Sequence, residues 1–154
     1  MNQLESKPEA RVNRFPMDYG VELQKSDGGP MEISAGHRPR IVVGPPSELG
    51  GSDVWWSPEH LLVSALASCI SATFFALAER AKLHVGTYRC RAHGILDRTE
   101  AHIAFVSMQL EVDITVLAGD VARTRAVIED AKKRCFVAGS LRCPVDLVAD
   151  VKAS

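Results

Sequence analysis

The chain has 154 residues, of which 46% are hydrophobic and 24% are charged, which is enough apolar material for one globular domain with a sizeable core. The formal net charge is -1 at pH 7, which excludes the basic surface of a nucleic-acid-binding protein and a polybasic membrane-binding patch. The N-terminus lacks a basic start followed by an apolar stretch, so we expect no secretory signal, a cytoplasmic location and reduced thiols.

The first part of the chain predicts an arm followed by a small sheet. Residues 1–16 are polar and contain two prolines, so we expect a loose arm ahead of a single domain over 17–154. Over 17–43, apolar and polar residues alternate in short runs that are separated by turn residues at 26–30 and by Gly36. This pattern predicts a three-stranded antiparallel meander.

A Pro- and Gly-rich connector at 44–53 leads into a long predicted helix that ends near Lys82. Ser57 is a favourable N-cap, Pro58 suits the first helical position, and Glu59 lies in the first turn at the positive end of the dipole.

Residues 61–78 of this helix carry no charge and are apolar nearly all round. We therefore expect a buried helix, and in so short a chain a second subunit would help to cover it. A membrane span also fits the length, but four hydroxyl side chains in the run and β-structure on both sides favour a core helix.

The second half of the chain predicts a hairpin, a second helix and a last strand. The hairpin covers 87–96 and 103–116 around a turn at 97–102, the helix covers 121–135 behind an N-cap at Asp120, a turn covers 136–144, and the strand covers 145–151. The order βββ-α-ββ-α-β predicts an α+β fold.

Four cysteines are the main candidates for chemistry. No pair has C-x-x-C spacing and the five histidines form no metal-binding pattern, so we expect no metal and no other cofactor. Cys69 lies in the middle of the long helix without a charged helical neighbour. Its surroundings fit an inert core residue, and they fit a reactive thiolate only if a cation or hydrogen-bond donor reaches it from elsewhere in the fold.

Cys135 strengthens the reactive interpretation. It follows the basic run 132–134, so we expect a partly exposed thiol in electropositive surroundings, although the C-terminal helix dipole opposes a thiolate. A buried and a semi-exposed thiol together suit two-cysteine peroxide chemistry, in which one forms a sulfenic acid and the other condenses with it to a disulfide. Cys143 is an alternative second thiol, whereas Cys90 should face the core beside Tyr88.

Three motifs, 48-ELGGSD-53, 57-SPEHLLVSALASC-69 and 131-AKKRCFVAGSLRCPVDLVADV-151, together resemble the OsmC/Ohr family of osmotically inducible and organic hydroperoxide resistance proteins. The resemblance extends over about 19–151. It implies an α+β fold built as an intertwined homodimer, with two central buried helices and sites at the subunit interface.

The resemblance also implies a thiol-dependent peroxidase that acts in oxidative or osmotic stress defence. Its substrates would be organic hydroperoxides, with hydrogen peroxide as a second candidate. Cys69 would be the peroxidatic thiol and Cys135 the resolving one. The reductant would be a dithiol, with a lipoyl-linked one as a candidate, and neither metal nor haem would be needed.

Glu59 matches the family's glutamate, which pairs with a thiol-activating arginine. Ten helical residues rise about 15 Å, so Glu59 and Cys69 of one unbroken helix cannot touch. Either the helix breaks or the glutamate comes from the other chain, which fits a dimer. The alternative is that Glu59 only complements the helix dipole.

The family's arginine has no counterpart at 24–29, which places the chain nearer an OsmC-like branch than a strict Ohr enzyme. Candidate activating cations are Lys25, Arg38 and Arg40, and lysine cannot make the bidentate carboxylate bridge.

Trp55 and Trp56 stand where relatives often carry smaller or polar residues. They would either line an apolar substrate pocket or pack a dimer. Together with the missing arginine, they motivate an alternative function: a non-enzymatic OsmC-like dimer that binds an apolar ligand or senses redox state.

Overall fold

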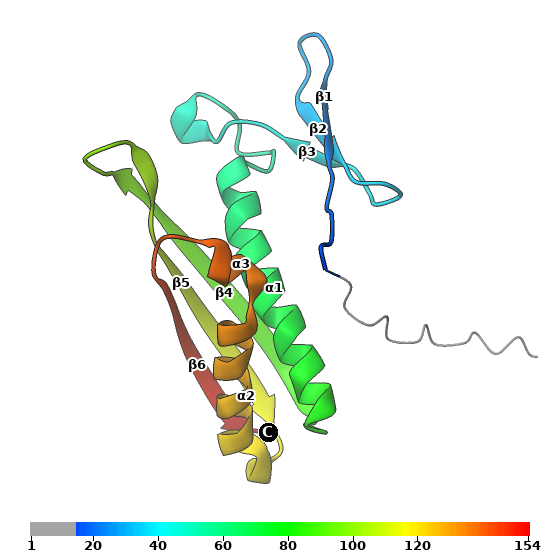
Figure 1. Ribbon diagram of the computed structural model, residues 1–154, viewed down its shortest axis with the longest axis vertical. Coiled ribbons are helices and arrows are strands. Elements are labelled where there is room, and N and C mark those ends of the chain that lie inside the picture. Colours follow the sequence, from blue (N-terminus) through cyan, green and yellow to red (C-terminus); the bar gives the residue numbers. More distant parts are fainter. Residues whose placement is uncertain (1–14) are drawn as a thin grey trace, which may run out of the picture.

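The computed structural model describes residues 15–154 and has the order βββ-α-ββ-α-α-β, which confirms the α+β class (Figure 1). The expected arm at 1–16 lies almost wholly outside the described residues. The strands are β1 (Glu22–Lys25), β2 (Met31–Ser34), β3 (Ile41–Val43), β4 (Val85–Arg98), β5 (Ile103–Val116) and β6 (Val145–Ala153); the helices are α1 (Pro58–Arg80), α2 (Val121–Arg134) and α3 (Phe136–Ser140).

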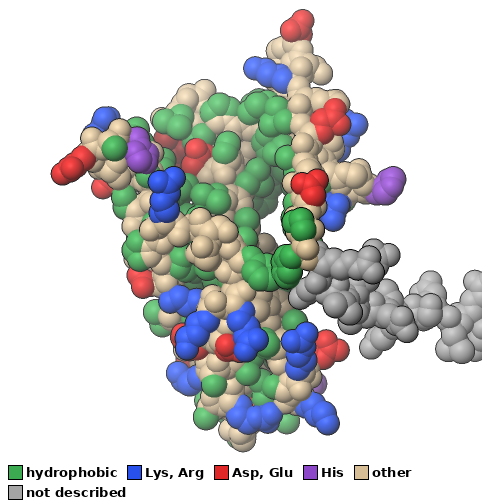
Figure 2. All heavy atoms as spheres, in the orientation of Figure 1, with side chains coloured by type: hydrophobic (Ala, Val, Ile, Leu, Met, Phe, Trp, Pro, Cys, Tyr) green, Lys and Arg blue, Asp and Glu red, His purple; other side chains and the backbone are tan. Residues whose placement is uncertain are grey.

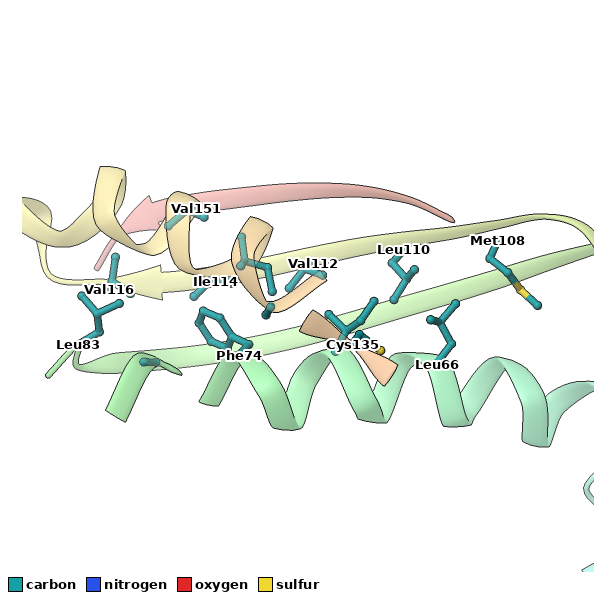
Figure 3. Close-up of a cluster of buried hydrophobic side chains, with 14 residues drawn as sticks. Leu66, Phe74, Leu83, Met108, Leu110, Val112, Ile114, Val116, Cys135 and Val151 are labelled. Carbon is teal, nitrogen blue, oxygen red and sulfur yellow. The ribbon is translucent and has the colours of Figure 1, made fainter. Parts of the chain in front are cut away.

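The main sheet has the order β4-β5-β6, with β4 antiparallel and β6 parallel to β5. One face of β5 is buried under the helices through Met108, Leu110, Val112, Ile114 and Val116 (Figure 3). Buried and more exposed residues thus alternate along the strand from Met108 to Val116, as expected of a strand with one buried face. On the other face, Arg91 lies between Glu111 and Asp113, at 3.1 and 2.9 Å. The core therefore lies between one face of the sheet and the helices, and each fully buried aliphatic side chain stabilises it by about 1.5–3 kcal/mol.

Helix α1 begins where the sequence predicted. The Ser57 side chain caps it by accepting a hydrogen bond from the His60 backbone N–H at 3.2 Å. The helix is unbroken to Arg80 and ends two residues before Lys82, whose φ of 54° is left-handed. By length and composition α1 could cross a membrane, but here it packs along β4, α2 and α3.

The expectation that α1 is buried all round is wrong for a single chain. Its fully buried residues form one stripe at four-residue spacing, namely Leu66, Ile70, Phe74 and Ala78. The opposite stripe is exposed although it is apolar or small; it comprises Ala65, Ser68, Ala72 and Phe75. One face of a hydrophobic helix is thus left without a partner in the described chain.

The second helical region differs from the prediction in two ways. Helix α2 ends at Arg134, and the expected turn after it contains the short helix α3. Asp120 does not cap α2 through its side chain; its carboxylate instead accepts a hydrogen bond from Arg123 at 2.8 Å. The sequence therefore predicts where α2 lies, but neither the residue at which it ends nor the partner of the Asp120 side chain.

The strands β1, β2 and β3 form a separate antiparallel sheet, the predicted meander, which projects from the N-terminal end of α1 (Figure 1). A parallel bridge between Val43 and Trp56 joins it to the start of α1. The connector between them turns tightly, with Gly50 at a φ of 79°, and a Cβ at Gly51 would overlap the carbonyl oxygen of Pro45. Only glycine fits that approach, which explains the Gly-Gly pair.

Candidate functional site

The structure brings Cys69 and Cys135 together. Cys69 lies on the side of α1 that faces α3, and Cys135 is the residue between α2 and α3. The two side chains interact, and both are free thiols. A reactive pair needs such an approach before a disulfide can form.

The two thiols differ in burial, in the opposite sense to the prediction. Cys135, expected to be partly exposed, is only 3% exposed and belongs to the main hydrophobic core, where it lies against α1 near Leu66 and Leu110 (Figure 3). Cys69 is only half-buried. The unexpected helix α3 causes the difference, because it folds back over α1 instead of leaving an open turn. Cys69 is therefore the thiol of this pair that is more open to a substrate.

The pKa of the Cys135 thiol is raised to about 11, mainly by burial and secondly by the neighbouring Cys69 side chain. The Ala138 backbone N–H, which donates to the Cys135 sulfur at 3.4 Å, acts in the opposite direction. Cys135 is thus the C-cap of α2 and also the N-cap of α3. The sequence indicated only the first of these, in which the helix dipole opposes a thiolate; at the N-terminus of α3 a backbone N–H points at the sulfur. At neutral pH this thiol holds its proton.

A groove of about 990 Å³ runs from the C-terminal half of α1 to the α2–α3 junction, and Cys135 is one of its lining residues. Three cations line it: Arg80, Lys133 and Arg134. The electropositive surroundings that the basic run predicted for Cys135 are therefore present in the fold, together with one cation from α1.

Glu59 lies on a different side of α1. It lines a hollow of about 460 Å³ next to β4, together with Cys90 and His60. Its Oε2 atom is shielded from solvent and has no hydrogen-bond partner within 15–154. Because α1 does not break, Glu59 and Cys69 of one chain stay about 15 Å apart along the helix axis.

Cys90 faces α1, as strand alternation predicted. Burial is the main cause of its raised pKa, and Tyr88 and Ser71 lie beside it. The Tyr88 hydroxyl is 2.8 Å from that of Ser71, and its ring packs against Phe74 and Phe75. Successive helical residues turn by about 100°, so Ser71 and Cys69 point to nearly opposite sides of α1. Cys90 and the Cys69–Cys135 pair therefore belong to different sites.

The candidate activating cations all lie on the meander. Arg40 forms an ion pair with Glu32 at 3.0 Å, and the Arg38 guanidinium donates to the carbonyl of Ala35 at 3.2 Å. Lys25 ends β1. None of the three lines the groove at Cys135 or the hollow at Glu59.

Trp55 and Trp56 lie before α1, at the far end from the thiol pair. Trp55 packs over Gly44, where an added Cβ would come 2.6 Å from its ring. Both tryptophans line a shallow hollow of about 210 Å³ with His60. Neither of them lines the groove at Cys135.

Two groove residues, Arg80 and Phe136, are not among the site residues that the sequence predicts. They lie in the predicted long helix and in the predicted turn at 136–144. The basic residue in the last turn of α1 was the available signal for Arg80, whereas nothing in the sequence indicated that α3 would bring Phe136 to the rim. No cluster of three or more His, Cys, Asp or Glu side chains that could hold a metal ion occurs in the part of the chain that the structure describes.

Comparison with known proteins identifies a matching family model, described as OsmC-like protein, over residues 50–149. This range includes the Gly-Gly pair, both thiols and most of β6. A search of curated proteins finds no match.

Solved structures share the fold at low sequence identity. An OsmC-like protein of unknown function from Vibrio cholerae has a TM-score of 0.78 at 16% identity, over 87% of this chain and 99% of that one. An organic hydroperoxide resistance protein from Elizabethkingia anophelis has a TM-score of 0.67 at 17% identity, over 90% and 97% of the two chains. An organic hydroperoxide resistance protein from Legionella pneumophila has a TM-score of 0.65 at 17% identity, over 90% of this chain and 99% of that one.

Proposed function

Since this chain belongs to the OsmC-like family, we propose that it is a thiol-dependent peroxidase that reduces organic hydroperoxides through Cys69 and Cys135. The observation that carries the proposal is the proximity of a half-buried thiol on α1 and a fully buried one at the start of α3. The organic hydroperoxide resistance proteins with the same fold support the substrate class.

In the proposed reaction, the Cys69 thiolate attacks an oxygen of the peroxide. The O–O bond breaks, the substrate leaves as an alcohol after taking a proton, and Cys69 becomes a sulfenic acid. The Cys135 sulfur then attacks the Cys69 sulfur. The hydroxide that leaves takes up the Cys135 proton and becomes water, and a Cys69–Cys135 disulfide remains. A dithiol reduces that disulfide and is itself oxidised to a disulfide.

The division of roles follows from burial. Cys69 is the less buried of the two thiols, so it meets the peroxide first. The pKa of Cys135 is raised to about 11, so this thiol stays protonated, and a protonated thiol does not attack the peroxide. Its reaction is held back until a sulfenic acid forms beside it.

We further propose that the working form is a homodimer. The exposed stripe of α1 at Ala65, Ser68, Ala72 and Phe75 is apolar enough to pack against a second copy. The meander also exposes large apolar side chains, including Leu23 and Ile41, and stands apart from the main body (Figure 2). A second chain would cover both surfaces.

A dimer would also complete the activation of Cys69. The Oε2 atom of Glu59 is shielded and has no hydrogen-bond partner within 15–154, and a cation beside it would stabilise the carboxylate. In the proposed dimer, that cation comes from the meander and is Lys25, Arg38 or Arg40. Glu59 and that cation would then act on Cys69 of the other chain. Arg40 can take part only if it shares or leaves Glu32.

A single-turnover experiment tests the peroxidase. The reduced protein is mixed with equimolar cumene hydroperoxide or hydrogen peroxide, and each thiol is followed by alkylation and mass spectrometry. We expect Cys69 to be lost first, faster with cumene hydroperoxide, and the C90S variant to behave like the parent protein. If Cys69 stays reduced in excess peroxide, the proposal is wrong.

A second candidate function is redox sensing or binding of an apolar ligand without turnover. The local engagement of Arg38 and Arg40 within the meander favours it, because these cations are then less free to activate a thiol. Slow oxidation of Cys69 without renewed peroxide consumption on addition of a dithiol would support this function instead.

A further inference from the structure

We propose that the cation-lined groove at Cys135 receives the dithiol reductant, that the reductant attacks the Cys135 sulfur, and that Arg80 and Lys133 select a reductant carrying a negative charge. This inference rests on the proposed function, because it concerns the second half of the same cycle.

The lining of the groove suggests an anionic ligand. Arg80, Lys133 and Arg134 line it without any acidic residue among the lining side chains. Arg134 is held by Asp130 at 2.8 Å, but neither Arg80 nor Lys133 pairs with an acidic group within 15–154. Figure 2 shows Lys and Arg side chains gathered over the part of the molecule where α2 and the end of α1 lie. Such a field attracts anions and stabilises an approaching thiolate.

The groove also has an apolar component. Ala76 and Leu77 of α1 line one side, next to Ala72, where the groove borders the stripe proposed as the dimer contact. Phe136, which is 71% exposed, lines the other side. A ligand with a short hydrocarbon chain and a charged end matches this combination. The volume of about 990 Å³ is ample for a small dithiol.

The direction of attack follows from which sulfur the groove reaches. Cys135 lines it, and Cys69 does not. Burial raises the Cys135 pKa, which makes Cys135 the poorer leaving group. Attack at Cys135 therefore avoids expelling the Cys135 thiolate in the first step.

The step balances as a thiol–disulfide exchange. A thiolate of the reductant bonds to the Cys135 sulfur, the disulfide bond breaks, and Cys69 leaves as a thiolate. The second thiol of the reductant then attacks its own mixed-disulfide sulfur and releases Cys135. The reductant ends as a cyclic disulfide, the protein gains two electrons, and two protons pass from the dithiol to the two cysteines.

Two probes differ only in charge: dihydrolipoate has a carboxylate where dihydrolipoamide has a neutral amide. The full-length protein is oxidised with diamide, so peroxide reactivity is not required, and excess oxidant is removed. Reappearance of the Cys69 and Cys135 thiols is then timed by quenched alkylation at low and high salt. We expect dihydrolipoate to react about threefold to tenfold faster, with the difference shrinking at high salt.

The variant R80Q/K133Q should lose this preference while keeping its rate with dihydrolipoamide. The control K132Q/R142Q removes the same charge outside the groove lining and should keep the preference. Equal rates with both probes in the parent protein, or an unchanged preference in R80Q/K133Q, would overturn the inference. If the oxidised protein reacts faster with dihydrolipoate but the reduced protein does not react with peroxide, the peroxidase proposal is wrong and the reductant site is still supported.

Discussion

Cys135 and Cys69 are neighbours in the same core cluster, and this proximity joins the middle of α1 to the residue that precedes α3. The two cysteines are 66 positions apart in the sequence, and the chain between them forms the β4–β5 hairpin and α2. The proximity therefore depends on the whole second half of the fold, and the chemistry proposed above depends on the proximity.

Removing the second thiol should trap the first intermediate. In C135S, Cys69 should still react with cumene hydroperoxide but remain a sulfenic acid, which dimedone labels and mass spectrometry detects. In C69S, peroxide consumption should fall by at least about a hundredfold, because the nucleophile is gone. C143S is the control, since Cys143 has no role in the proposed cycle. A dimedone adduct at Cys143 or Cys90 in place of Cys69 would reassign the nucleophile.

The thiolate of Cys135 should form only at strongly alkaline pH. Absorbance at 240 nm, compared between the parent protein and C135S, should show an ionisation near pH 11. In C69S the midpoint should fall, because Cys69 contributes to the raised pKa. Ionisation of Cys135 at or below its ordinary value of 9.0 would contradict the burial that the structure shows.

The same raised pKa predicts how stability depends on pH. The folded state holds the Cys135 proton more tightly than the unfolded state, so this contribution is fully present below pH 9 and is lost as pH rises toward 11. The loss is at most about 2–3 kcal/mol. Urea unfolding at pH 8 and pH 11 measures it, and C135A should lose less stability over that interval than the parent protein.

Glu59 should serve the cysteine of the other chain. E59Q should lower the rate of Cys69 oxidation about tenfold or more, whereas E79Q, the same change near the other end of α1, should not. The sharper test mixes chains: a heterodimer of C69S and E59Q combines an intact Cys69 on one chain with an intact Glu59 on the other. Activity near half of the parent value is expected. Activity no higher than that of E59Q would mean that Glu59 acts within its own chain.

The exposed face of α1 should be the dimer contact. A65R places a charge on that face without filling any space inside the single chain, and burying an unpaired charge costs several kcal/mol. Sedimentation should therefore show monomers at micromolar concentration. A122R, a matched change on the exposed side of α2, should leave the dimer intact. A monomeric parent protein, or a dimeric A65R, would contradict this assignment.

The Gly-Gly connector should tolerate no side chain at its second position. A Cβ at Gly51 would overlap backbone atoms of Pro45, so G51A should lower the free energy of unfolding by about 1–3 kcal/mol. G119A is the control, because nothing lies within 4 Å of the added atom there. Equal unfolding free energies for the two variants would show that the connector shifts at no cost.

The sequence predicted the regular elements well because their signals are local. Hydrophobic alternation gave β5, and Ser57 with Pro58 gave the start of α1. The ends of α2 were less predictable. Asp120 is a favourable capping residue, but Arg123, three residues later, takes its carboxylate at the position where a capping box would have Glu or Gln.

The site was only partly predictable, because burial depends on contacts far apart in sequence. The basic run beside Cys135 suggested exposure, yet α3 folds over α1 and buries the thiol to 3% exposure. The groove needs Arg80 from one helix and Lys133 from another, and no spacing within either helix connects them. From the sequence, α1 is apolar nearly all round and needs a second subunit to cover it. Which of its residues are left exposed is known only from the structure.

The most direct test of the central claim is disulfide mapping after a single turnover. One equivalent of cumene hydroperoxide is added to the fully reduced parent protein, free thiols are blocked, and the linked peptides are identified by mass spectrometry without reduction. A Cys69–Cys135 linkage in most of the oxidised chains is the predicted result. A Cys69–Cys143 linkage, or a Cys69 that remains blocked as a free thiol, would contradict the account.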